Sequence, residues 1–154
     1  MYVIEMPEKK QPVAIEPVTA SDYRLITKKR YAFDWKLEKT KSVYKLRIKG
    51  QTDILGLISL DFFPKEERIE IRLLAVSKEN EGKGKAIDRI AGNLIAYAAK
   101  LAIQAYGANA AISLVPKTKL TQHYMNKYGF EPAGLSLFMV GENLLALLKE
   151  YDYD

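Results

Sequence analysis

The spacing of apolar residues changes near residue 86, and this change restricts the possible folds more than any other feature of the sequence. Before it, apolar residues come in short β-branched and aromatic runs that are typical of strands. After it, they recur every three or four positions, which is the spacing of one helix face. The recurring positions are Ile87, Ile90, Ala91, Leu94, Ile95, Ala98, Leu101, Ala102 and Ala105. The pattern predicts one long helix at residues 86–106.

Strands are predicted on both sides of this helix. Three runs separated by turn residues, at 43–48, 54–62 and 69–76, should form an antiparallel meander. After Gly107 the sequence predicts, in order, a strand at 110–115, a helix from Thr118 to about residue 128, a strand at 135–140 and a helix at 142–151. A strand–helix–strand crossover joins parallel strands. The predicted class is therefore α+β, with a mixed, mostly antiparallel sheet and one parallel pair around a central crossover helix.

The first forty residues carry shorter patterns. We expect a loosely held leader at residues 1–11, a short strand at 12–17 and a helix from residue 19 to about Arg30. Residues 31–40 fit either a strand, since Phe33, Trp35 and Leu37 alternate, or a lid-like loop. A chain of 154 residues is short for two separate cores, so we expect one domain over residues 1–154.

Composition excludes several kinds of site. With no cysteine and one histidine, His123, the chain can form neither disulfides nor thiolate or multi-histidine metal sites. The first ten residues lack the apolar run of a signal peptide, and no stretch reaches the ~20 apolar residues of a membrane span. We therefore expect a cytoplasmic protein with no membrane partner. The net charge of +5 is dispersed and suits solubility, which disfavours nucleic acid as a partner.

The segment between the third strand and the long helix is the best candidate for a binding site. It contains Gly82 and Gly84, with lysines at positions 83 and 85. Two glycines let backbone N–H groups turn toward one point, and the first turn of a helix adds unpaired N–H groups and its positive dipole end. Such a place suits a phosphate or diphosphate. The pattern matches neither a P-loop nor the dinucleotide fingerprint, which would need a third glycine at position 87.

Two motifs resemble those of the GNAT superfamily of N-acetyltransferases. The first is Glu81-Gly82-Lys83-Gly84-Lys85-Ala86, similar to that family's Gln/Arg-x-x-Gly-x-Gly/Ala between a strand and a long helix. The second is Tyr124-Met125-Asn126-Lys127-Tyr128-Gly129-Phe130, similar to Phe-Tyr-Glu-Lys-Leu-Gly-Phe. Both small positions of the first motif match, and Glu81 replaces Gln or Arg. The resemblance covers roughly residues 43–140.

The resemblance implies transfer of an acetyl group from acetyl-CoA, the cosubstrate, to a primary amine. It also implies which residues contact coenzyme A. The backbone of Leu74, Ala75 and Val76 would pair with the pantetheine amides, and the pyrophosphate would lie on Glu81, Gly82, Lys83, Gly84, Lys85 and Ala86. Thr118 replaces the family's helix-capping asparagine and is expected in the same set. Dimers are common in the family, so a homodimer is a candidate assembly.

Glu70 and Tyr124 are the candidate catalytic residues. Glu70 stands where some family members carry a general base, and a carboxylate among apolar neighbours can act through water; alternatively, it pairs with a nearby Arg or Lys, namely Arg72, Arg68 or Lys45. Tyr124 lies one residue before the family's acid tyrosine, whose place Met125 takes. It fits either an accessory acid or a core aromatic, and His123 fits a surface residue.

A second function remains open beside the enzyme. Three polar positions of the family differ here, at Glu81, Met125 and Thr118. Loss of polar site residues is what a catalytically silent acyl-CoA-binding or protein-interaction module would show, since a fold does not by itself establish activity. The sequence does not specify the acceptor amine.

Overall fold

The computed structural model describes residues 1–116 and 121–152, and the chain's contacts divide it into two compact units. Unit 1 comprises Met1–Ser59 and Leu73–Leu94, and unit 2 comprises Leu60–Arg72 and Ile95–Asp154. The chain passes between the units within β4 (Gly56–Phe63), β5 (Arg68–Val76) and α1 (Ile90–Tyr106). None of the helices in the described ranges combines the length and apolar character needed to cross a membrane.

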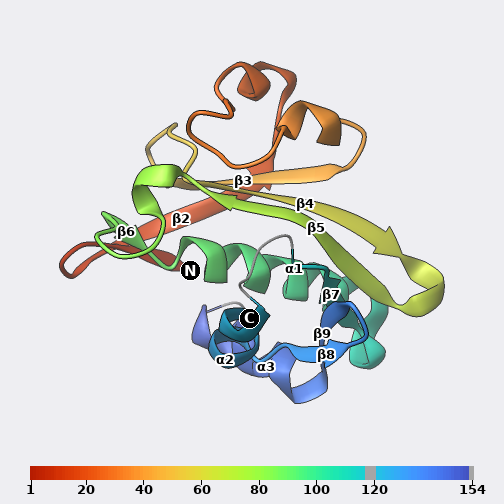
Figure 1. Ribbon diagram of the computed structural model, residues 1–154. Helices are drawn as coiled ribbons and strands as arrows, with labels where there is room; N and C mark the ends of the chain where they lie inside the picture. Colours follow the sequence, from red (N-terminus) through yellow and green to blue (C-terminus); the bar gives the residue numbers. More distant parts are fainter. Residues whose placement is uncertain (117–120, 153–154) are drawn as a thin grey trace. The chain divides into compact units, whose positions relative to one another are not determined.

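The predicted class, meander and parallel pair are confirmed. The strands are hydrogen-bonded in the order β6-β1-β2-β3-β4-β5-β7-β9-β8, in which β3 (Ser42–Ile48), β4 and β5 are consecutive (Figure 1). β5 pairs in parallel with β7 (Ala111–Leu114), and α1 is the crossover helix between them. Ile69 and Ile112 are partners in this register and are fully buried, so apolar burial supports the pairing.

The helix α1 begins at Ile90, four residues after the predicted start at residue 86. Residues Ile87–Asp88 instead form a short strand, β6, that pairs antiparallel with β1 (Tyr2–Glu5). The Met6 N–H donates to the Ala86 carbonyl at 2.9 Å. Because this backbone is bonded to the N-terminal strand, it cannot also form the first helical turn, although Ile87 fits the helical period.

Residues 1–11 belong to the sheet and are not the loosely held leader that we expected. β1 pairs antiparallel with β2 (Lys9–Pro17), and β2 pairs with β3. Val3 and Val13 are fully buried. The sequence patterns missed the ordered N-terminus because each of these two strands has only one buried residue, a valine, and so gives almost no periodic signal.

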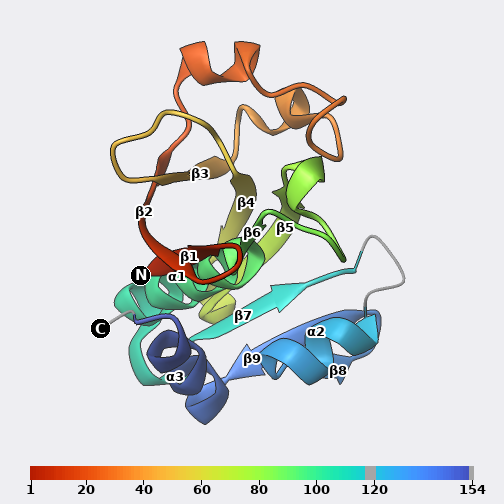
Figure 2. The ribbon, with the colours of Figure 1, turned by 90° about the vertical axis from the view of Figure 1, so that its left-hand side faces the viewer.

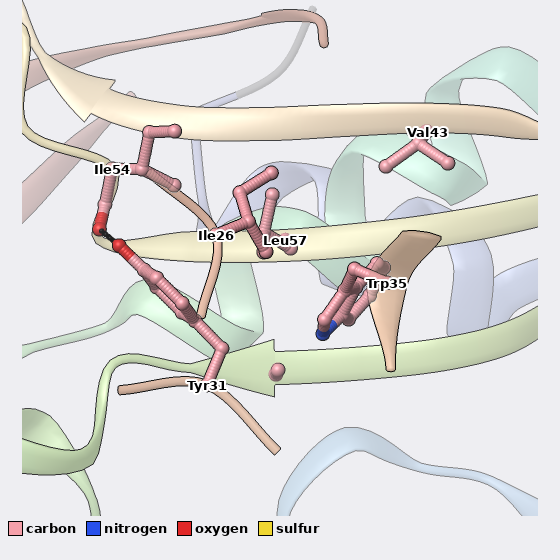
Figure 3. Close-up of a cluster of buried hydrophobic side chains, with 7 residues drawn as sticks. Ile26, Tyr31, Trp35, Val43, Ile54 and Leu57 are labelled. Carbon is pink, nitrogen blue, oxygen red and sulfur yellow. Dashed lines mark hydrogen bonds between the residues drawn. The ribbon is translucent and has the colours of Figure 1, made fainter. Parts of the chain in front are cut away.

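The segment between β2 and β3 contains two 3-10 helices, Ala20–Arg24 and Trp35–Glu38; the first lies within the helix that was predicted from residue 19 to about Arg30. Tyr31 and Trp35 are buried and pack with Ile26 against Val43 and Leu57 (Figure 3). The Tyr31 hydroxyl donates to the carbonyl of Ile54, and the Trp35 indole N–H donates to that of Ala32. Residues 31–40 therefore form no strand; they are a loop with one 3-10 turn that contributes core side chains to unit 1.

Two helices and two strands complete unit 2: α2 (Thr121–Tyr128), β8 (Glu131–Ala133), β9 (Ser136–Val140) and α3 (Gly141–Glu150). β9 pairs antiparallel with both β7 and β8, and Figure 2 shows β7 beside β9. β8 was not predicted, because its residues are exposed and lack apolar alternation. Short 3-10 turns occupy Pro64–Glu66, Lys78–Asn80 and Gly107–Asn109.

Candidate functional site

The chain between β5 and β6 forms an exposed glycine loop in unit 1, here defined as residues 81–86. Gly82 and Gly84 have φ angles of 61° and 78°, whereas Glu81 has a φ of −85°. Lys83 and Lys85 do not have positive φ. A positive φ at alternate positions turns the chain sharply, and successive N–H groups in such turns can form a concavity that favours an anion. Glycine is required at the two positive-φ positions because it adopts them without steric cost.

The backbone N–H groups of the glycine loop are available to a ligand. Among the hydrogen bonds of the described residues, none is donated by the N–H groups from Gly82 to Ala86. Bonding begins again at Ile87, whose N–H donates to the Asn80 side chain at 2.8 Å. These five successive N–H groups therefore make no hydrogen bond of standard geometry among the described residues, and donors of this kind can bind phosphate oxygens.

The first turn of α1 is separated from the glycine loop by β6, so the expectation that this turn adds its N–H groups to the loop is corrected. Arg89, just before the helix, has a φ of 76°, and its N–H donates to the Asp88 carboxylate at 2.8 Å. Any anion at the loop would thus depend on the loop's own backbone rather than on a helix N-terminus.

Charged side chains around the loop are arranged unequally. Lys83 and Glu81 are exposed, so the acidic side chain that replaces the family's Gln or Arg is not confined beside the backbone N–H groups. Lys85 is half-buried, and its ammonium lies 3.1 Å from the Asp88 carboxylate. Lys83 is therefore the lysine whose charge is less compensated, because it takes part in none of the ion pairs among the described residues.

The end of β5 is connected to this loop by Ser77 and the 3-10 turn Lys78–Asn80. The parallel register with β7 covers Arg68 to Ile71, and β5 then continues to Val76. Within the described ranges no β7 residue is registered against the last part of β5. Ala75 is buried, whereas Leu74 and Val76 are half-buried. The backbone of this strand end is thus the part of β5 that lacks a parallel strand partner.

Glu70, a candidate base, lies in unit 2 and is partly exposed. Its carboxylate is 3.4 Å from Arg68 Nη1, and the same nitrogen donates to Ser113 Oγ at 2.9 Å. Arg68 also bonds Glu66 at 3.0 Å and stacks over the Phe63 ring. Of the ion-pair partners considered from the sequence, Arg68 is the one that contacts Glu70.

Tyr124, the candidate acid, lies among aromatic rings on α2. Its ring centroid is 6.0 Å from that of Tyr128 and 6.2 Å from that of Phe130. Burial raises the pKa of the Tyr124 hydroxyl, so this group stays protonated at neutral pH. His123 is exposed, as expected. Thr118 lies outside the described residues.

Two residues that the sequence patterns did not single out shape the surroundings of the loop. Asn80 bonds to the loop base, and an Asn close to glycines is a turn signal that could have drawn attention to it. Arg30 donates to Asp53 at 2.5 and 2.9 Å and to Glu79 at 2.5 and 2.9 Å. Its hydrogen bonds lower the pKa of both carboxyl groups. No local signal marks Arg30, because its partners lie 23 and 49 residues away.

Other parts of the described chain add no predicted site residue. A hollow of about 430 Å³ in unit 1 is lined by Pro17, Val18, Ala20, Tyr23, Lys39, Lys41, Ser42, Val43 and Tyr44. None of the predicted site residues lines it. In the described ranges no three His, Cys, Asp or Glu side chains are grouped so as to hold a metal ion.

Comparison of the sequence with protein-family models and with curated protein sequences gave no match. Solved structures do match. A mutant of the toxin AtaT, bound to the C-terminus of the antitoxin AtaR and acetyl-CoA, has a TM-score of 0.60 at 16% identity over 89% of this chain and 98% of that one. The chain has the GNAT fold.

Two further matches come from other acetyltransferases. A mutant of the spermidine N-acetyltransferase SpeG from Vibrio cholerae has a TM-score of 0.62 at 13% identity, covering 86% of this chain and 96% of that one. N-acetylglutamate synthase from Neisseria gonorrhoeae, complexed with coenzyme A and L-arginine, has a TM-score of 0.61 at 16% identity, covering 88% of this chain and 34% of that one. At such low identities the likeness establishes the fold and leaves the chemistry to the site itself.

Proposed function

We propose that this protein is an N-acetyltransferase that uses acetyl-CoA and acetylates a primary amine. The observation that carries the proposal is the glycine loop: five successive backbone N–H groups that donate no hydrogen bond among the described residues, in a loop with positive φ at Gly82 and Gly84 that lies between β5 and β6 of a GNAT fold. The match to structures that contain acetyl-CoA or coenzyme A supports the same ligand.

The residues present fit coenzyme A in two places. The N–H groups of Gly82 to Ala86 would donate to the pyrophosphate oxygens, and Lys83 would add a positive charge. The backbone of Leu74 to Val76 would pair with the pantetheine amides, because the pairing of β5 with β7 ends at Ile71. Glu81 would contribute through its backbone while its exposed carboxylate stays in solvent.

Acyl transfer to an amine requires one proton to leave the attacking nitrogen and one to reach the departing sulfur. Acetyl-CoA supplies the thioester. We assign the removal of the first proton to Glu70, directly or through water. Arg68 Nη1, 3.4 Å from the Glu70 carboxylate, would orient it. Tyr124 is assigned as an accessory donor for the second proton, since its raised pKa keeps the hydroxyl protonated.

The proposal extends to the class of acceptor and no further. The names of the matching structures mention different compounds: spermidine for one, N-acetylglutamate for another, and acetyl-methionyl-tRNAfMet in a complex of AtaT. The first is an amine and the other two are N-acetylated compounds, so acetylation of an amine is the shared chemistry that we carry over to the present chain.

The test is binding of coenzyme A and acetyl-CoA, measured as a rise in melting temperature. Ligand at a hundredfold excess over its dissociation constant should add about 2.7 kcal/mol to the free energy of unfolding. Gly84→Val should remove this rise, because a β-branched residue is strained at a φ of 78° and would displace the loop backbone.

Gly50→Val is the matched control. Gly50 also has a positive φ, of 85°, and a Cβ there, as at Gly84, would meet nothing within 4 Å. This control should lose a similar amount of intrinsic stability and keep the full ligand-induced rise. A wild-type protein that shows no rise with millimolar coenzyme A or acetyl-CoA would contradict the proposal. Binding without acetyl transfer to any amine would instead identify the silent acyl-CoA-binding module.

A further inference from the structure

The glycine loop is closed at its base by one buried side chain. Asn80 is 5% exposed and lies just before the loop. Its Oδ1 accepts the N–H of Ile87, just after the loop, at 2.8 Å, and its Nδ2 donates to Ser77 Oγ at 2.9 Å. The amide thus spans seven positions of the chain and joins the two ends of a six-residue loop.

Ser77, to which the Asn80 side chain is hydrogen-bonded, is itself held in place by the protein. Ser77 is fully buried, and its N–H donates to the Leu55 carbonyl at 2.9 Å. The Asn80 N–H donates to the Ser77 carbonyl at 2.8 Å, which closes the 3-10 turn Lys78–Asn80. Both hydrogen-bonding ends of the Asn80 amide are therefore used inside the protein, and its orientation is determined by them.

The far end of the loop has a second support. The Met6 N–H donates to the Ala86 carbonyl, next to the Asn80–Ile87 bond. Ile87 is also registered against Glu5 in the β1–β6 pairing. Between these fixed ends, the loop itself has no internal hydrogen bond that involves the N–H groups of Gly82 to Ala86 among the described residues.

This arrangement matters because a free loop would have to be ordered when a ligand binds. Fixing the backbone of one residue costs about 1–2 kcal/mol, and glycine has more conformational freedom to lose than any other residue. Holding the loop ends in advance lowers this cost, and a ligand then binds more tightly without any additional contact. The displaced start of α1 increases the need, because no α-helix begins directly after the loop.

We propose that Asn80 is a positioning residue of the anion site: by closing the loop base, it holds the N–H groups of Gly82 to Ala86 in the arrangement that binds a diphosphate. The inference rests on the proposed function, since coenzyme A is the diphosphate in question. Asn80 acts through the loop backbone, and its own amide is fully engaged with Ser77 and Ile87.

The test compares coenzyme A affinity with the intrinsic stability of each variant, using calorimetry well below the melting temperature. Asn80→Ala should weaken binding by about tenfold, because both side-chain hydrogen bonds of Asn80 are lost, and with the bond to Ile87 the order of the loop that depends on it. Ser77→Ala should have a smaller effect, since Asn80 Oδ1 can still accept the Ile87 N–H. Amide hydrogen exchange at Ile87 should become faster in Asn80→Ala and much less so in Ser77→Ala.

Asn143→Ala is the control, because the Asn143 side chain also makes a hydrogen bond to the backbone, by donating to the Gly129 carbonyl at 3.1 Å, and lies outside the glycine loop. It should lower the melting temperature without changing the affinity for coenzyme A. If Asn80→Ala lost stability and still bound coenzyme A as tightly as wild type, Asn80 would be a structural residue only and the inference would fail alone. If the wild-type protein bound no coenzyme A, both the proposed function and this inference would fail.

Discussion

Arg68 connects Glu70 to a small polar network, and this determines how the role of Glu70 can be tested. The guanidinium contacts Glu70 at 3.4 Å, Glu66 at 3.0 Å and Ser113 at 2.9 Å. A substitution at Glu70 therefore also changes the surroundings of Arg68. The informative comparison is with a variant that removes another carboxylate from the same arginine.

Glu70→Gln should lower turnover by about 10²–10⁴-fold at neutral pH, because an amide cannot take a proton from the acceptor. Coenzyme A affinity should be nearly unchanged. At high pH more of the amine is already neutral, so the defect should shrink. The measurement is a pH–rate profile with an identified acceptor. Glu66→Gln, which removes the more exposed partner of Arg68, is the control and should retain activity.

Tyr124→Phe should cost far less than Glu70→Gln, since water can also protonate the departing thiolate. Its hydroxyl lies in an aromatic cluster on α2 that packs equally well around phenylalanine. A Glu70→Gln enzyme with the wild-type rate at every pH would leave Glu70 as an ion-pair partner of Arg68. A crippled Tyr124→Phe would then identify this hydroxyl as the main acid.

At the scale of elements, the approach of β4 to α1 depends on Gly56. A Cβ built at Gly56 would lie 2.6 Å from Ile90 Cγ2 and 2.9 Å from Leu94 Cδ1. All three residues are buried and belong to unit 1. The first turn of α1 can therefore pack on this strand only where the strand has no side chain, which fixes the helix start beyond the glycine loop.

Gly56→Ala should lower the free energy of unfolding by about 1–3 kcal/mol, the typical cost of overpacking a core. Denaturant unfolding measures it. Ile90→Ala removes the atom that the new methyl group would meet, so the two substitutions should be coupled. In the Gly56→Ala background, Ile90→Ala should cost less than it does in the wild-type protein. Strict additivity of the two changes would show that the close contact is relieved in another way.

At the scale of the whole chain, the two units share three continuous elements. β4, β5 and α1 each begin in one unit and end in the other. An element that must be formed in both units at once transmits unfolding of one to the other. This physical link supports the expectation of one domain over residues 1–154, which stays a prediction.

We predict that both units unfold in one transition. Trp35 is the chain's single tryptophan and is buried in unit 1, so its fluorescence reports that unit. Far-ultraviolet circular dichroism reports mainly the helices, of which α2 and α3 lie in unit 2. Coincident midpoints from the two probes in urea are the expected result. Midpoints that differ beyond error would identify two independently unfolding domains.

The order of most helices and strands could be predicted because the patterns that indicate them involve residues close together in the sequence. The meander, the crossover helix and α3 follow from hydrophobic periods and turn residues. Gly82 and Gly84 indicated the loop because glycine readily adopts a positive φ, a preference that can be read from the residue type alone. For the candidate site, the sequence could thus point to the loop and to Glu70, but not to what surrounds them.

Only the tertiary structure decided which distant residues hold these pieces in place. β1 and β6 pair across more than eighty residues, which moves the start of α1 to Ile90 and removes the helix N-terminus from the loop. Arg30 meets Asp53 and Glu79, Arg68 meets Ser113, and Met6 meets Ala86. A periodic pattern records which face of an element is buried, but it does not record the partner. That choice is made by packing and hydrogen bonding once the whole chain has folded.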